Sequence, residues 1–215
     1  MDDEKSELLY ALFTKLLQEL NEIKEKESIK NDDIDSIIKS YEKKLKIIMN
    51  RSAKKPSFSL KYGQSYIIDE EKPVECYNIF KQAISRGSSG LCITRTHPES
   101  ISFYGSAKNV KFIWLSKANV EGKKEYTSLQ PSDLNIIVNN ITDFIKSNLR
   151  GVILLEGLEM LYTNSGFQNL IKAITTIKDL VAENKGVFLI SVNLKSFKEE
   201  EKNILIREFN PITVP

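Results

Sequence analysis

The chain has 215 residues, of which 41% are hydrophobic and 28% charged, so it suits one ordinary domain with an appendage or two small domains. This apolar fraction excludes a wholly disordered chain. The 31 Lys and Arg residues against 29 Asp and Glu residues give a net charge of +2, so no overall field marks a nucleic-acid or membrane binder.

Residues 1–50 show the period of amphipathic helices, with a break at 28–32 that predicts a helical hairpin. Two helices alone bury too little apolar surface to be stable. The hairpin therefore packs either on the rest of the chain or, as we favour, on a second copy as a coiled-coil-like dimer. The residues expected to carry this contact are Leu9, Leu12, Phe13, Leu16, Leu20, Ile34, Ile38, Tyr41 and Leu45.

A charge reversal follows the hairpin. Residues 1–42 hold 6 Lys and 12 acidic residues, a balance of −6, whereas residues 43–61 hold 7 cations and no acid. Pro56, Gly63 and several serines predict a linker over 51–63. We favour a solvated linker over a phosphate or anionic-lipid contact, and nucleic-acid binding is a third interpretation that we do not expect. The cations concerned are Lys43, Lys44, Lys46, Arg51, Lys54 and Lys55, followed by Lys61.

Residues 64–215 alternate continuous apolar strands with amphipathic helices. This pattern predicts an α/β domain with a parallel, doubly wound sheet and helices on both faces. The expected strands are 65–69, 90–94, 111–115, 151–157, 186–192 and 211–214, and the expected helices are 73–86, 132–145, 166–181 and 199–209.

Ligands of open parallel sheets bind beyond the carboxyl ends of the strands. Arg95, Lys117, Glu156 and Gly157 are the candidate ligand-binding residues at these ends. Glu156 ends the apolar run VILLE, an arrangement similar to the Walker B acid that holds Mg²⁺ in nucleotide-hydrolysing cores of the RecA and KaiC type. Alternatively, Glu156 places its charge at the start of the following helix, and Arg95 forms an ion pair with Glu99 or Glu156.

The loop after the first strand excludes standard ATP hydrolysis. A phosphate-binding loop needs G-x-x-x-x-G-K-[ST] at this place, so that backbone N–H groups can surround the phosphates. The chain instead has DEEKPVEC, which contains no glycine and begins with three carboxylates. We therefore expect no catalytic residues and no cofactor.

Few residues are suited to metal or redox chemistry. Cys76 and Cys92 are too few for a zinc site, and we expect them to be buried reduced thiols, although a disulfide between them remains open. The single His97, which we interpret as a loop residue, excludes a His-rich metal centre. Trp114 is predicted to lie in the core. The acidic start MDDEKSELLY and the lack of a long apolar run favour a cytoplasmic protein without a membrane span.

Several ordered motifs resemble an archaeal family known as domain of unknown function 835, over about residues 64 to 208. The resemblance implies an archaeal origin and a RecA/KaiC-like core without a phosphate loop. It also implies a regulatory or adaptor role beside sensory and signalling proteins. The strand-end acid, usually Asp in the family, is Glu156 here, which puts magnesium binding of the usual geometry in doubt. The motifs lie at Ser65–Pro73, Gly90–Glu99, Phe112–Leu115, Pro131–Leu134, Val152–Leu161, Asn164, Gly166 and Phe167.

The expected function is that of a non-catalytic interaction or regulatory module with a protein partner or a second copy. The alternative is a sensor domain that binds a nucleotide or another anion at the strand ends through Arg95, Lys117 and Glu156.

Overall fold

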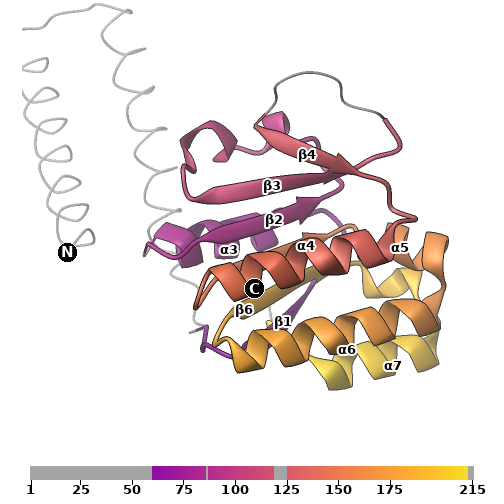
Figure 1. The fold of residues 1–215 in the computed structure, drawn as a ribbon. Helices are drawn as coiled ribbons and strands as arrows, with labels where there is room; N and C mark the ends of the chain where they lie inside the picture. Colours follow the sequence, from indigo (N-terminus) through magenta and orange to yellow (C-terminus); the bar gives the residue numbers. More distant parts are fainter. Residues whose placement is uncertain (1–59, 86, 119–124, 213–215) are drawn as a thin grey trace, which may run out of the picture. The chain divides into compact units, whose positions relative to one another are not determined.

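The computed structural model describes residues 60–85, 87–118 and 125–212, which all belong to one compact unit. The predicted hairpin over 1–50 and most of the predicted linker lie outside these residues. The described residues form a seven-stranded sheet in the order β4-β3-β2-β5-β6-β1-β7, and every neighbouring pair is parallel (Figure 1). The predicted parallel α/β fold is thereby confirmed.

The strands are β1 (Gln64–Asp69), β2 (Gly90–Thr94), β3 (Val110–Leu115), β4 (Tyr126–Leu129), β5 (Val152–Glu156), β6 (Val187–Val192) and β7 (Asn210–Ile212). The helices are α3 (Glu75–Ser85), α4 (Leu134–Ser147), α5 (Leu158–Ser165), α6 (Phe167–Glu183) and α7 (Glu199–Glu208). Short 3-10 turns η1 (Pro98–Ser100), η2 (Tyr104–Ser106) and η3 (Leu194–Ser196) complete the set. The sequence pattern did not predict β4 and α5.

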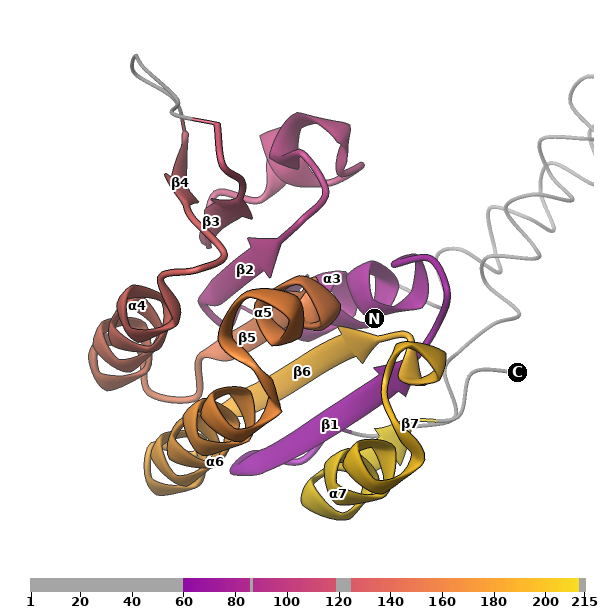
Figure 2. The same ribbon diagram turned by 90° about the vertical axis from the view of Figure 1, so that its right-hand side faces the viewer.

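Helices cover both faces of the sheet. One face packs against α4, α5, α6 and α7 through aliphatic residues such as Ile141, Ile174 and Leu205. The opposite face packs against α3 and the η1–η2 segment, which contribute Phe80 and Phe103. Figure 2 shows this arrangement from the carboxyl ends of the strands, which lie on the right in Figure 1. Because β2, β5 and β6 are buried along their whole length, their sequences are apolar runs without alternation.

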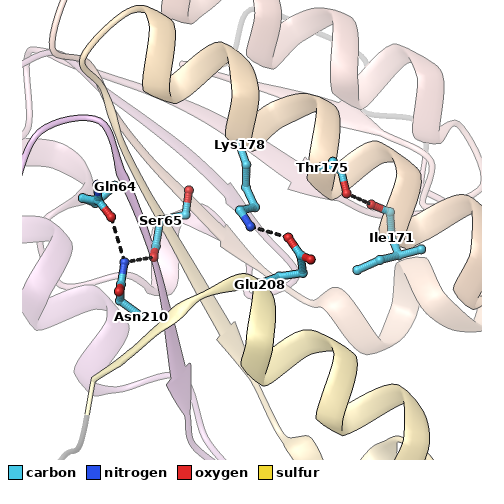
Figure 3. Close-up of polar contacts among 7 residues, drawn as sticks. All are labelled: Gln64, Ser65, Ile171, Thr175, Lys178, Glu208 and Asn210. Atoms are coloured by element: carbon cyan, nitrogen blue, oxygen red, sulfur yellow. Dashed lines mark hydrogen bonds and ion pairs between the residues drawn. The ribbon is translucent and has the colours of Figure 1, made fainter.

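Polar contacts join β7 to β1 and α7 to α6 (Figure 3). The Asn210 side-chain amide donates to Gln64 Oε1 at 3.0 Å and to the Ser65 carbonyl at 3.1 Å, which joins β7 to β1. Lys178 of α6 forms an ion pair with Glu208 of α7. These contacts hold β7 at the edge next to β1, with which β6 pairs on the other side.

Candidate functional site

The candidate site lies at the carboxyl ends of β1, β2, β5 and β6. The chain leaves β2 toward β3 on one side and leaves β5 toward β6 on the other, so the connections diverge between β2 and β5. Such a switch point is where open α/β sheets bind ligands. Glu156 and the loop after β2 lie at this switch point.

The carboxylate of Glu70, just after β1, occupies the start of α3. Its Oε2 accepts hydrogen bonds from the backbone N–H groups of Val74 at 3.0 Å and Glu75 at 2.9 Å. Its Oε1 accepts from the N–H of Cys76 at 3.2 Å and from Ser191 Oγ of β6 at 2.7 Å. Free N–H groups at a helix start are the groups that bind phosphates in nucleotide-binding folds. Here the chain's own carboxylate takes the position of the anion.

The carboxylate of Glu156, at the end of β5, binds the loop that follows β2. Its Oε2 accepts from Thr94 Oγ1 at 2.7 Å and from the backbone N–H groups of Arg95 at 2.7 Å and Thr96 at 3.1 Å. Tyr77 of α3 donates its hydroxyl to the same oxygen at 3.3 Å. Glu156 is buried, so these donors replace water around its charge. None of these donors belongs to α5, and α5 has no side-chain hydrogen bond at its N-cap.

A hollow of about 240 Å³ lies between these two carboxylates. Two further acids at the strand ends also accept backbone amides: Asp69 Oδ1 accepts from Leu194 N–H at 3.0 Å, and Glu159 accepts from Asn193 N–H. The lining contains four glutamates and no Lys or Arg, so it does not suit an anion. It consists of Glu70, Glu71, Pro73, Glu156, Glu159, Ser191, Val192, Asn193 and Ser196.

The buried thiols and the Tyr77 phenol around the site keep their protons, because their pKa values are raised. Burial, with the nearby Glu70 carboxylate, raises the pKa of the Cys76 thiol. Burial also raises the pKa of Cys92 and of the Tyr77 phenol, with a smaller contribution from Glu156 in both cases. A neutral buried thiol is a poor nucleophile and a poor metal ligand. Within the described ranges, no group of three or more His, Cys, Asp or Glu residues could hold a metal ion.

One comparison with known proteins supplies a family. The family model described as "Protein of unknown function (DUF835)" matches residues 69–209, which is more than half of the 215 residues. The chain belongs to the DUF835 family. No curated protein matches this chain. The DUF835 match begins at the last residue of β1 and ends just before β7, so it includes both carboxylates described above.

Of the predicted ligand residues, one lines the hollow in this DUF835 domain. Glu156 lines the hollow, whereas Arg95, Lys117 and Gly157 do not. The Arg95 side chain is exposed, and Glu156 binds the backbone N–H of Arg95. No ion pair of Arg95 occurs among the described residues. Gly157 has a φ of +97°, and a Cβ there would lie 3.0 Å from Arg95 Cβ, so these two residues close the space between β5 and β2.

Aromatic residues surround the loop that carries Arg95. Trp114 is half-buried, and its Nε1 donates to the Arg95 carbonyl at 3.1 Å. The His97 ring lies 4.7 Å from the Trp114 ring, and its Nε2 lies 3.1 Å from the Tyr126 hydroxyl. The prediction that Trp114 lies in the core is thus correct only in part, because its indole edge supports the loop.

Sequence reasoning missed Glu70, Thr94, Tyr77 and Ser191. The run DEEK was used only to exclude a phosphate loop, but its spacing to α3 also fits a carboxylate that turns back to the helix start. Cys76 and Cys92 are free and buried, so the expected reduced thiols are confirmed. In the part of the chain that the structure describes, no helix is both long and apolar enough to cross a bilayer.

Proposed function

We propose that this protein is a non-catalytic interaction or regulatory module, built on a degenerate RecA-type nucleotide-binding core. The observation that carries the proposal is the Glu70 carboxylate on the N–H groups of Val74, Glu75 and Cys76. These donors would otherwise receive a phosphate. A domain that fills this position with its own anion keeps the architecture of the fold without the ligand.

The hydrogen bonds of Glu156 support the same proposal. A Walker B acid directs a carboxylate oxygen at Mg²⁺ or at its bound water, whereas Glu156 Oε2 accepts four hydrogen bonds from the chain itself. The neighbouring hollow is lined by glutamates, which repel a nucleotide. The alternative of an anion sensor would use the exposed Arg95 and Lys117, neither of which lines this hollow.

Thermal unfolding of the full chain tests the proposal. We expect no rise in melting temperature with ATP, GTP or cyclic dinucleotides, each with and without Mg²⁺. A ligand at 100 times its dissociation constant would stabilise the fold by about 2.7 kcal/mol, which such an assay resolves easily. A nucleotide-dependent rise that Arg95→Ala abolishes would establish the sensor instead.

Two variants test the role of Glu70. In Glu70→Ala, the amides at the start of α3 lose their acceptor, so inorganic phosphate should stabilise this variant and leave the wild-type protein unchanged. Glu71→Ala is the matched control, because Glu71 also lines the hollow but its ion pair is with the exposed Lys195, at 3.3 Å, and not with the start of α3. Equal responses of the two variants to phosphate would contradict the assignment.

We further propose that the protein acts with a protein partner or as a homodimer through residues 1–50, in a signalling context. The support is the apolar stripe of that segment, which needs a surface to pack on.

A further inference from the structure

Three adjacent turns at the amino ends of the strands form a surface that we call the basal surface, consisting of Lys61, Tyr62, Leu149, Arg150 and Lys185. Backbone hydrogen bonds join the turns: Arg150 N–H donates to the Asn184 carbonyl at 3.3 Å, and Gly63 N–H donates to the Gly186 carbonyl at 2.6 Å. The Arg150 guanidinium carbon lies 5.1 Å from the centre of the Tyr62 ring. The three turns that carry these side chains are therefore adjacent at one end of the sheet.

The basal surface combines cations with protruding apolar side chains. Leu149 is 73% exposed, the largest exposed fraction among the large hydrophobic residues described, and Tyr62 is 51% exposed. Lys61, Arg150 and Lys185 are all exposed. Across residues 60–63, 146–151 and 182–186 there are four cations, counting Lys146, and one acid, so the balance is 4 − 1 = +3.

Backbone geometry gives an independent indication that two of these cations matter. Arg150 (φ 62°) and Lys185 (φ 52°) are the non-glycine residues with positive φ in the described chain. Lys185 follows the end of α6, where Gly186 N–H donates to the Val181 carbonyl at 2.9 Å. Glycine is the usual residue at such a helix end, because a side chain there is strained. The chain nevertheless places cations at both positions, on adjacent turns of one surface.

We propose that the basal surface docks on an anionic membrane surface, with Leu149 and Tyr62 entering the interface and the cations facing lipid phosphates. Amphipathic basic patches bind such surfaces because apolar burial and attraction to anionic headgroups act together. A nucleic acid would also attract the cations. Its charged phosphate backbone, however, offers no apolar region in which the exposed Leu149 side chain could be buried. The inference does not depend on the proposed role of Glu70 and Glu156 at the carboxyl ends of the strands.

Co-sedimentation of the full chain with vesicles tests this surface. Binding should appear with phosphatidylcholine vesicles that contain about a third phosphatidylserine, should be absent with phosphatidylcholine alone, and should weaken as salt is raised. Removing one cation should weaken binding about fivefold, from about 1 kcal/mol per Lys or Arg near the membrane. Leu149→Ser should weaken it about tenfold.

The Lys185→Gly variant distinguishes a loss of membrane binding from a loss of folding. This variant removes the strained side chain, so its melting temperature should stay equal or rise while vesicle binding falls. Lys172→Gln, on exposed α6 surface away from the turns, and Ile136→Ser, which is 46% exposed on α4, are the matched controls and should bind as the wild type does.

Three results would overturn the inference. One is absence of binding to anionic vesicles, and another is binding that Leu149→Ser and Lys185→Gly leave unchanged. The third is binding to a short DNA or RNA strand, measured by fluorescence anisotropy, that these variants reduce while vesicles are not bound. The nucleotide assay of the proposed function is read separately, so failure of one does not imply failure of the other.

Discussion

Glu156 Oε2 lies 2.7 Å from Thr94 Oγ1, and both residues are buried at the carboxyl ends of the adjacent strands β5 and β2. The same oxygen receives the amides of the following loop, so one carboxylate determines where that loop leaves the sheet. The acid that resembles a metal ligand in the sequence thus has a structural role in the fold.

Glu156→Ala should destabilise the protein by about 2–3 kcal/mol, because it removes the carboxylate that accepts from the Thr94 hydroxyl and from the backbone N–H groups of Arg95 and Thr96. Glu156→Gln, which retains a side-chain oxygen, should cost less. Urea unfolding followed by circular dichroism measures both. Glu99→Ala, at an exposed position of the same loop region, serves as the control and should stay within about 0.5 kcal/mol of wild type. A loss in Glu156→Ala no larger than that of the control would contradict the anchoring role.

Gly157→Ala should also destabilise the fold, by about 2–3 kcal/mol. The cost combines an unfavourable positive φ of 97° with a new Cβ placed 3.0 Å from Arg95 Cβ. Gly87→Ala is the matched control, because Gly87 has a φ of +91° and a Cβ there meets no atom within 4 Å. The same unfolding assay should give about 1 kcal/mol for Gly87→Ala. Equal losses in the two variants would show that the β2–β5 contact is unimportant.

Stability should decline above pH 9. The raised pKa of Cys76 keeps its proton bound in the folded state, whereas the unfolded thiol ionises near its ordinary value of 9.0. The folded state then holds more protons than the unfolded state, so the unfolding free energy falls by up to about 1.4 kcal/mol per pH unit for each such thiol. The contribution is fully present below pH 9 and is lost as the pH rises. Denaturation curves between pH 7 and 11 measure it.

The thiols provide the control for this pH dependence. A variant with Cys76→Ala and Cys92→Ala should show a shallower decline, although Tyr77 still contributes above pH 10 because its pKa is also raised. In the native protein at pH 8, neither thiol should react with a disulfide reagent until the chain unfolds. Rapid reaction of the folded protein would rule out burial of these groups.

The full chain should be a dimer in size-exclusion chromatography with light scattering. Replacing Leu12 and Leu16 by Asp places charges in the apolar stripe predicted from the sequence and should produce monomers. Lys15→Ala, between these positions, should leave the dimer intact. A wild-type chain that elutes as a monomer would exclude homodimerisation, leaving a different protein as the partner.

The sequence was sufficient to predict a parallel α/β sheet and the position of most of its strands and helices. Strands buried on both faces need continuous apolar runs, and GLCIT, VILLE and VFLISV are such runs. The lack of glycine after β1 likewise excluded a phosphate loop without any structure. β4 was missed because it is a four-residue strand that is only partly buried, and α5 because its eight residues are bounded by glycines rather than by a long apolar period.

The tertiary structure alone decided what the polar residues at the strand ends do. Glu156 and Thr94 are 62 positions apart, and Glu70 and Ser191 are 121 apart, so no local spacing relates them. They meet because the strand order places β5 beside β2 and β6 beside β1, and hydrophobic periodicity specifies each strand without specifying its neighbours. For the same reason, the contact of Tyr62 with Arg150 became visible only when the turns were folded side by side.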